Sequence, residues 1–253
     1  MSSEKVHVEH CKGVNGLDKV YLYGGQVTSW KNAHGEELLF VSSKASFRPP
    51  RAIRGGIPIC FPQLKSTGSL EQYGFARNRI WSIDPDPPSS PSDISHKAFV
   101  DLILTHSEED MKIWPHRYEY RLRVALGPTA VELLWFKMMH TVFLGIESSV
   151  DKVYLSTPTK IAILDHERKR TFELRKYGLP DAVVWNPWDK KAKAMADFGD
   201  NEYMHMLCVE AACVEEPITL KPGEEWKGRQ EISAVPSSYY SEQLDPRRLL
   251  LSG

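Results

Sequence analysis

Polar and apolar residues alternate in many short runs of the sequence, and this alternation predicts β-strands. The clearest run is 117–124, where the even positions are Tyr, Tyr, Leu and Val and the odd positions are Arg, Glu, Arg and Arg. A period of two residues is typical of a strand with one buried face and one face in water. Similar runs predict strands at 19–23, 26–30, 37–41, 99–105, 131–139, 142–146, 160–164, 171–175, 182–185, 207–214, 218–220 and 226–235.

Turn residues between these runs predict hairpins. Gly24-Gly25 separates the first two runs and is a strong hairpin signal. A second hairpin is expected across 165–170, and its basic residues 168–170 are expected to be solvated at the tip. The one helix that the pattern favours is 189–197, with the acidic Asp189 as its cap.

Many short strands with almost no helix predict an all-β protein, a large antiparallel β-sandwich. Sandwiches of 200–250 residues commonly form one domain, so residues 1–253 are expected to be a single domain with an irregular tail from about 236. The proline-rich stretch 85–93 could link two domains or form a long hairpin loop. Strands of the same character on both sides favour the loop.

Composition narrows the range of partners. A net charge of −1 gives no bulk attraction to nucleic acid or to anionic membranes, and no apolar run is long enough to span a bilayer. The first residues contain no hydrophobic signal region, and the four cysteines show no CxxC spacing. Both features predict a cytoplasmic protein with reduced thiols. The nine histidines have no metal-ligand spacing, so no metal is expected. We expect a monomer.

The stretch 51–81 holds several polar residues that a hydrophobic core does not require. Arg54 precedes Gly55-Gly56, two prolines interrupt the apolar run that follows, and Gln72 and Arg77 lie on either side of another glycine. Guanidinium groups bind phosphate or carboxylate through two parallel hydrogen bonds, so this stretch suits a small anionic ligand. The alternative is that both arginines are surface charges and the glycines are turn residues.

Two carboxylates are further candidates. Glu210 lies in LCVEAACV, where its neighbours are apolar or small. If its side chain points inward, burial raises the pKa of the carboxyl group, which suits a general base; the period of two equally permits an outward side chain. Asp151 precedes a predicted strand and alone could be a turn residue.

Six stretches of the chain form specific motifs: IRGGIPICFPQ (53–63), GFARNRIW (74–81), VDKVYLSTP (150–158), VVWNPWDKKAKAMADFGD (183–200), MLCVE (206–210) and LKPGEEWKGR (220–229). These motifs resemble those of the glucose-6-phosphate 1-epimerases, the hexose-6-phosphate mutarotases of the aldose 1-epimerase superfamily, and most of all the plant-type members. The resemblance runs in order through most of the chain. It implies the galactose-mutarotase-like β-sandwich and no metal or organic cofactor.

The resemblance also implies roles for single residues. Arg54 and Arg77 match family ligands of the substrate, a hexose 6-phosphate, with phosphate as their natural partner. Gln72 matches an amide that contacts the sugar, and Asp151 matches an aspartate that binds a sugar hydroxyl. Glu210 matches the general base that opens the sugar ring by removing the anomeric proton, so that reclosure gives the other anomer.

The sequence departs from the family pattern at two places. Tyr73 stands where the family has histidine. Between Val131 and Val150 the family has a longer segment with further strands and a histidine that is the general acid. His140 echoes that motif, but too few residues separate it from the preceding strand, so we expect the acid and part of one sheet to be absent.

The expected function is therefore the interconversion of the α and β anomers of glucose 6-phosphate by a poor mutarotase. One alternative is a sugar-phosphate-binding protein without turnover. Another is a remnant that neither binds nor folds well, because a sandwich that lacks strands exposes unpaired edges.

Overall fold

The computed structural model describes residues 8–13, 16–63, 70–88, 98–127, 130–139, 152–165, 167–216 and 218–236. The expected strand 142–146, His140, Asp151 and the tail beyond 236 lie outside these ranges.

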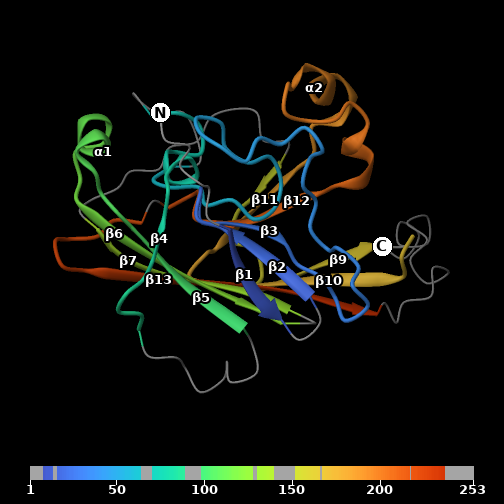
Figure 1. Ribbon diagram of the computed structural model, residues 1–253, viewed down its shortest axis with the longest axis horizontal. Helices are drawn as coiled ribbons and strands as arrows, with labels where there is room; N and C mark the ends of the chain where they lie inside the picture. Colours follow the sequence, from blue (N-terminus) through green and yellow to red (C-terminus); the bar gives the residue numbers. More distant parts are fainter. Residues whose placement is uncertain are drawn as a thin grey trace, which may run out of the picture.

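A seven-stranded antiparallel sheet forms the base of the molecule (Figure 1). Neighbouring strands exchange backbone hydrogen bonds along their full registers. In spatial order the strands are β4 (Ser82–Ile83), β5 (Ala98–Thr105), β6 (Tyr118–Leu126), β7 (Ala130–Met139), β13 (Glu225–Pro236), β10 (Arg170–Tyr177) and β9 (Lys160–Asp165).

Two three-stranded antiparallel sheets complete the strands of the described chain. One consists of β1 (Val8–Gly13), β2 (Gly16–Tyr21) and β3 (Gln26–Ser29), and the other of β12 (Cys208–Ala212), β11 (Asp181–Trp185) and β8 (Lys152–Tyr154). Val20 and Val27 of the first small sheet share a buried core with Leu122 and Val124 of β6. Sheet therefore packs on sheet, and the expected all-β fold is confirmed.

Strand β6 explains how the alternating pattern builds this core. Tyr118, Tyr120, Leu122 and Val124 are all buried, as the period of two predicts. The opposite face is not uniformly wet, however, because Arg123 is only 1% exposed. It lies directly opposite Asp101 of β5 in the strand register and forms an ion pair with it, so the expectation of a solvated charged face is wrong at this position.

The helices differ from the expectation. Helix α2 spans Trp188–Ala194, so it is shorter than 189–197, and Asp189 lies in its first turn and pairs with Lys193 rather than capping the helix. Helix α1 (Glu108–Ile113) was not expected. A reciprocal pair of hydrogen bonds between Ser107 and Asp110 caps its N-terminus, a pattern that stabilises even a short helix.

Two predicted strands are wrong. Residues 37–41 make only isolated bridges, with the carboxylate of Glu37 accepting hydrogen bonds from the backbone N–H groups of Trp30, Leu38 and Leu39. Residues 218–220 form no strand. At 37–41, hydrogen bonds to the Glu37 carboxylate take the place of a strand ladder.

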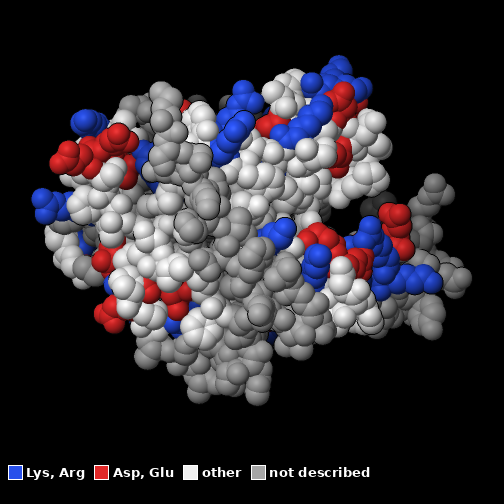
Figure 2. All heavy atoms as spheres, in the orientation of Figure 1, with Lys and Arg blue, Asp and Glu red and all other residues white. Residues whose placement is uncertain are grey.

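Charged side chains of both signs are intermixed on the face seen in Figure 2. The basic tip of the β9–β10 hairpin follows this pattern, since Arg168 and Arg170 both pair with Glu36. Such exposed pairs are typical of a solvated surface rather than of a nucleic-acid site. In the described ranges no helix is both long and apolar enough to cross a membrane.

Candidate active site

The first segment of the site is the Arg54-Gly55-Gly56 bend, which lies against strand β3. Gly55 and Gly56 have φ angles of 111° and 63°, and a Cβ atom on Gly56 would lie 2.2 Å from the carbonyl oxygen of Val27. Only glycine fits this close approach of two backbones. The buried side chain of Gln26 fixes the bend by donating to the carbonyl oxygens of Ile53 and Gly55.

The second segment is the turn 71–78. Tyr73 and Gly74 have φ angles of 68° and 66°, and a Cβ on Gly74 would lie 2.2 Å from the carbonyl oxygen of Phe61. A single turn of 3₁₀-helix, Ala76–Asn78, follows and carries Arg77. The carbon of the Arg77 guanidinium lies 4.5 Å from the centre of the Tyr73 ring, and Nη2 donates to the carbonyl oxygen of Gln72 at 3.3 Å.

The third segment is strand β12, which carries Glu210. Glu210 lies opposite Val183 of β11, and its Oε1 accepts a hydrogen bond from Sγ of Cys208 at 3.1 Å. Burial raises the pKa of the Glu210 carboxyl group, while the thiol of Cys208 and the positive charge of Arg77 partly oppose this rise. The carboxyl group is therefore shielded from water, although the residue as a whole is only half-buried.

The second and third segments, together with Cys60 from the stretch between the first two, form a group of five residues that we call the Glu210 cluster: Cys60, Tyr73, Arg77, Cys208 and Glu210. Burial, followed by the negative charge of Glu210, raises the pKa of both thiols and raises that of Tyr73 to about 12. All three groups are thus protonated near neutral pH. Burial lowers the pKa of Arg77, which nevertheless stays a cation because guanidinium groups remain charged in proteins.

Arg77 lacks the partners that a shielded cation usually has. Its Nε atom is buried without a hydrogen-bond partner, and within the described ranges the side chain forms no ion pair. A buried donor of this kind is costly unless a ligand or water binds it.

Arg54 borders the cluster and has a carboxylate partner. Its Nε and Nη2 atoms both lie 3.1 Å from Oδ2 of Asp197, which follows helix α2. The positive charge of Arg54 acts on both Arg77 and Cys208, so the two arginines share one site.

The loop after Asp197 is held by Glu202. Burial of the Glu202 carboxyl group would raise its pKa, but hydrogen bonds from Ser42, Ser43 and the backbone of Gly199 outweigh burial and lower the pKa to about 2. This carboxylate joins the loop 197–202 to residues 42–43, and the backbone N–H of Ser42 in turn donates to the carbonyl oxygen of Arg54. Asp197 and Arg54 are thus fixed by connected contacts.

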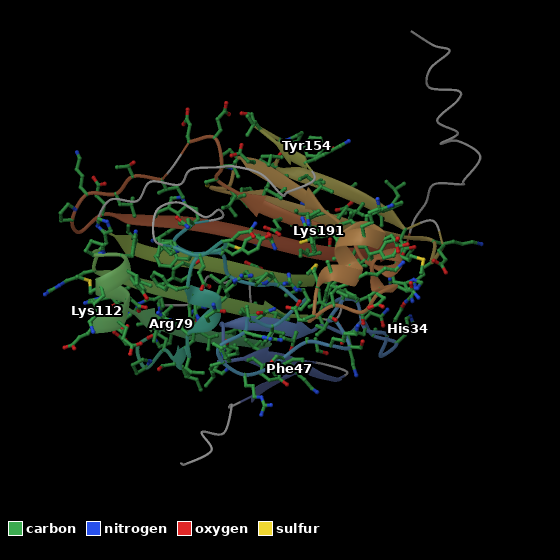
Figure 3. All side chains as sticks on the ribbon, turned by 90° about the horizontal axis from the view of Figure 1, so that it is seen from above. His34, Phe47, Arg79, Lys112, Tyr154 and Lys191 are labelled. Carbon is green, nitrogen blue, oxygen red and sulfur yellow. The ribbon has the colours of Figure 1, made fainter. Side chains whose placement is uncertain are left out.

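Helices α1 and α2 stabilise the two sides of this region (Figure 3). On one side Arg79, which follows the turn 71–78, forms a 2.6 Å ion pair with Asp110 of α1. On the other side Lys191 of α2 lies over the ring of Trp185 at the end of β11. Both contacts join segments adjoining the site to a neighbouring helix.

The structure thus brings Arg54, Arg77 and Glu210 into one region, and Gln72 adjoins it through its carbonyl group. Asp151 and His140 lie outside the described residues. Sequence reasoning did not assign Tyr73, Cys60, Cys208 or Asp197 to the site. The signal available for Cys60, Cys208 and Asp197 was their position inside three of the motifs quoted above, and Tyr73 immediately precedes a fourth, GFARNRIW.

The described part of the chain offers no metal site, since it holds no group of three or more His, Cys, Asp or Glu side chains that could bind an ion. Nor does any described histidine hydrogen-bond to Glu210. What the cluster offers is a shielded carboxylate, a guanidinium group and neutral hydroxyl and thiol groups, a set suited to proton transfer near an anion.

Solved structures of similar shape define the fold class. A crystal structure of the mutarotase YeaD from Salmonella typhimurium superposes with a TM-score of 0.74 at 22% sequence identity, covering 93% of this chain and 92% of that one. A galactose mutarotase-like protein from Lactobacillus casei superposes with a TM-score of 0.62 at 12% identity, covering 90% of this chain and 100% of that one. The fold is the galactose-mutarotase-like β-sandwich.

The sequence comparisons give the family. The family model described as Aldose 1-epimerase matches residues 7–135 and 135–233. A protein of Cenchrus ciliaris named as a glucose-6-phosphate 1-epimerase is 57% identical over 285 residues, covering 93% of this chain and 87% of the relative. A protein of Escherichia coli with the same name is 27% identical, covering 77% of this chain and 79% of the relative. The chain belongs to the aldose 1-epimerase family.

The same matches also concern the segment that we expect to be shortened, between Val131 and Val150. An alignment of 285 residues is longer than this chain of 253 residues, so it includes positions at which the Cenchrus ciliaris protein has residues and this chain has none. The two pieces of the family match meet at residue 135, in β7 and within the stretch where the sequence indicates a missing segment.

Proposed function

We propose that this chain interconverts the α and β anomers of glucose 6-phosphate, as a cytoplasmic monomer without a cofactor. The names of its relatives support this substrate and reaction. The observation that carries the proposal is the arrangement around Glu210: a shielded carboxyl group with a raised pKa lies near Arg77, whose shielded guanidinium has no ion-pair partner among the described residues.

In this proposal Glu210 is the general base. Its carboxylate removes the proton from the anomeric hydroxyl group, the bond between C1 and the ring oxygen breaks, and an aldehyde forms at C1. Rotation about the C1–C2 bond and reclosure give the other anomer. A carboxyl group whose pKa lies above its usual range accepts this proton more readily at neutral pH than an ordinary carboxylate.

Arg54 and Arg77 are the proposed ligands of the phosphate group. Two guanidinium groups whose charges act on one another repel unless an anion lies between them, and a phosphate dianion supplies that charge. Gln72 and Asp151 would contact sugar hydroxyl groups, as the family resemblance implies.

The alternative is a protein that binds the sugar phosphate without turning it over. It is favoured by the absence, in the described ranges, of a histidine that hydrogen-bonds to Glu210 and by the alignment positions that this chain lacks. Without a positioned acid the rate should be lower by roughly two to four powers of ten than that of a full-length relative.

Magnetisation transfer between the anomeric protons of glucose 6-phosphate tests the proposal, with the Cenchrus ciliaris relative as reference. We expect exchange above the spontaneous rate but slower than that of the relative. Thermal stabilisation by glucose 6-phosphate without exchange would favour the binding protein, because a ligand that binds only the native state must raise its stability. If glucose 6-phosphate caused neither exchange nor stabilisation, both functions would be contradicted.

A further inference from the structure

Tyr73 has a backbone conformation that an aromatic residue rarely adopts. Its φ angle is 68°, and it precedes Gly74, which also has a positive φ angle and where a Cβ atom would lie 2.2 Å from the carbonyl oxygen of Phe61. Such a conformation is strained for a residue with a Cβ atom and tends to persist where function depends on it. The turn therefore presents Tyr73 at this place at a cost in stability.

The side chain of Tyr73 lies within the Glu210 cluster. The guanidinium of Arg77 covers its ring at 4.5 Å, and burial and the negative charge of Glu210 both act on its hydroxyl group. Among the residues that the structure describes, none hydrogen-bonds to this hydroxyl group. The ring is held in place, and the polar end is available to a ligand bound beside Glu210.

We propose that Tyr73 is the proton donor to the ring oxygen of the sugar, and hence a catalytic residue in the role that the family resemblance assigns to a general-acid histidine. This inference rests on the proposed anomer exchange. It assigns to one residue of the chain the second proton transfer that ring opening requires.

Glu210 and Tyr73 together account for every proton that moves in ring opening and reclosure. The Glu210 carboxylate takes the proton of the anomeric hydroxyl, and the electron pair of that O–H bond forms the C1 carbonyl. The C1–O bond of the ring breaks, and its oxygen takes the phenolic proton of Tyr73. After rotation the phenolate removes that proton again, the oxygen attacks the other face of the carbonyl carbon, and Glu210 returns its proton to the anomeric oxygen.

The surroundings of Tyr73 fit this role. Burial, with the charges of Glu210 and Cys60, raises its pKa to about 12, so at neutral pH the phenol is present in its acid form. The positive charge of Arg77 acts in the opposite direction and stabilises the phenolate that forms during the reaction. A phenol of this pKa is a weaker acid than an imidazolium, which agrees with the expectation of slow turnover.

Tyr73→Phe tests the assignment, because it removes the proton while keeping the ring under Arg77. We expect the maximal exchange rate to fall at least about 100-fold, with little change in the KM for glucose 6-phosphate or in the melting temperature. Tyr177→Phe, which alters an exposed tyrosine on β10, is the matched control and should exchange at the original rate. Undiminished exchange in Tyr73→Phe would overturn this inference alone, whereas no exchange in the unaltered protein would overturn the proposed function as well.

A second variant separates proton donation from a structural role of the ring. In Tyr73→His an imidazolium can donate the proton, so exchange should exceed that of Tyr73→Phe at low pH and decline as pH rises through the imidazole pKa near about 6.5. Arg77 would lower that pKa, and the negative charge of Glu210 would raise it; the thiols of Cys60 and Cys208 stay neutral in this range. Exchange in Tyr73→His as slow as in Tyr73→Phe at every pH would overturn the assignment.

Discussion

Arg77 and Arg123 are both shielded from water, but they differ in how many hydrogen-bond partners the fold gives them. Arg123 of β6 donates through Nε and Nη2 to the two carboxylate oxygens of Asp101 at 2.7 and 3.0 Å, and Nη2 also donates to the carbonyl oxygen of Pro88 at 2.6 Å. Among the described residues, Arg77 lies over an aromatic ring and donates to one carbonyl oxygen, and its buried Nε has no partner. The fold thus binds Arg123 through a carboxylate and a carbonyl group, whereas Arg77 keeps a donor, Nε, that can bind a ligand.

The same contrast separates two carboxylates. Asp181 of β11 is shielded, but backbone N–H groups of Ser156, Val214 and Glu215 donate to it and lower its pKa despite burial. Among the described residues, Glu210 receives a hydrogen bond only from the thiol of Cys208, and burial raises its pKa. A charge that the fold satisfies is structural, and one that the fold leaves poorly satisfied is a candidate for chemistry.

The largest expected effect comes from Glu210→Gln, which keeps the shape of the side chain and removes its basicity. We expect exchange between anomers to fall by roughly two to four powers of ten, measured by magnetisation transfer. In the unaltered protein the rate should rise with pH through the Glu210 pKa, because only the carboxylate accepts a proton. Glu173→Gln, which alters a half-buried carboxylate of β10 that pairs with Lys160, is the control and should keep its rate.

The stability of Glu210→Gln sharpens the contrast with Asp181. Because the folded pKa of Glu210 lies above its unfolded value, its contribution to stability is present below about 4.5 and is lost as pH rises through the folded pKa. The melting temperature of the variant should therefore equal or exceed that of the unaltered protein at neutral pH. A large loss of stability with exchange preserved would make Glu210 a structural residue.

Arg123→Ala should have the largest effect on stability. It leaves Asp101 buried without its counter-charge, and breaking a buried pair in this way costs about 3–5 kcal/mol, measurable by urea unfolding. Replacing both residues, as in Arg123→Met with Asp101→Leu, should restore much of the loss, since no uncompensated charge remains. If Arg123→Ala lowered the free energy of unfolding by less than about 1 kcal/mol, the pair with Asp101 would contribute no more than an exposed ion pair does.

These two arginines also mark what the sequence could and could not predict. The alternation in 117–124 predicts strand β6 and its buried face correctly, but it assigns Arg123 to water. The burial of Arg123 depends on the register that sets it opposite Asp101, and register between strands is not encoded in the period of either strand. Helix α1 was missed for a related reason, because its cap is a reciprocal contact between two polar residues within an apolar-poor stretch.

The site was predictable where its signal was local. The glycines beside Arg54 and Arg77 indicate close backbone contacts, and the structure contains those contacts at Val27 and Phe61. Asp197, by contrast, is 143 positions from its partner Arg54, and nothing in the alternation of either segment connects them. Long-range pairs of this kind require the three-dimensional arrangement.

Arg77→Ala tests whether the arginine without an ion-pair partner among the described residues serves the ligand rather than the fold. It removes a cation that the fold does not pair, so the melting temperature should change little, whereas binding of glucose 6-phosphate should weaken by about 1.5–3 kcal/mol. Arg54→Ala should weaken binding similarly, and neither variant should change the affinity for glucose. Isothermal titration with both sugars measures this, with Arg175→Ala on β10 as the control. Equal losses for glucose and glucose 6-phosphate would contradict phosphate recognition by these arginines.

Asp197→Asn should have the smallest effect on binding and stability. It tests Arg54, whose ion pair is intermediate between the buried pair of Arg123 and Arg77, which has no ion pair among the described residues. Arg54 has a carboxylate partner, as Arg123 has, but the pair is partly exposed, with 29% of the arginine side chain and 19% of the aspartate side chain accessible. The two donors of Arg54 that bind Asp197 are also donors that a phosphate could take, so Asp197 competes with the ligand while orienting its partner. Asparagine keeps an acceptor oxygen and removes the negative charge. We therefore expect a few-fold tighter binding of glucose 6-phosphate and unchanged binding of glucose, with a loss of stability of at most about 1 kcal/mol, the scale of a partly exposed pair. Weaker binding of glucose 6-phosphate, comparable to that of Arg54→Ala, would instead mean that the charge of Asp197 is needed to hold Arg54 in place.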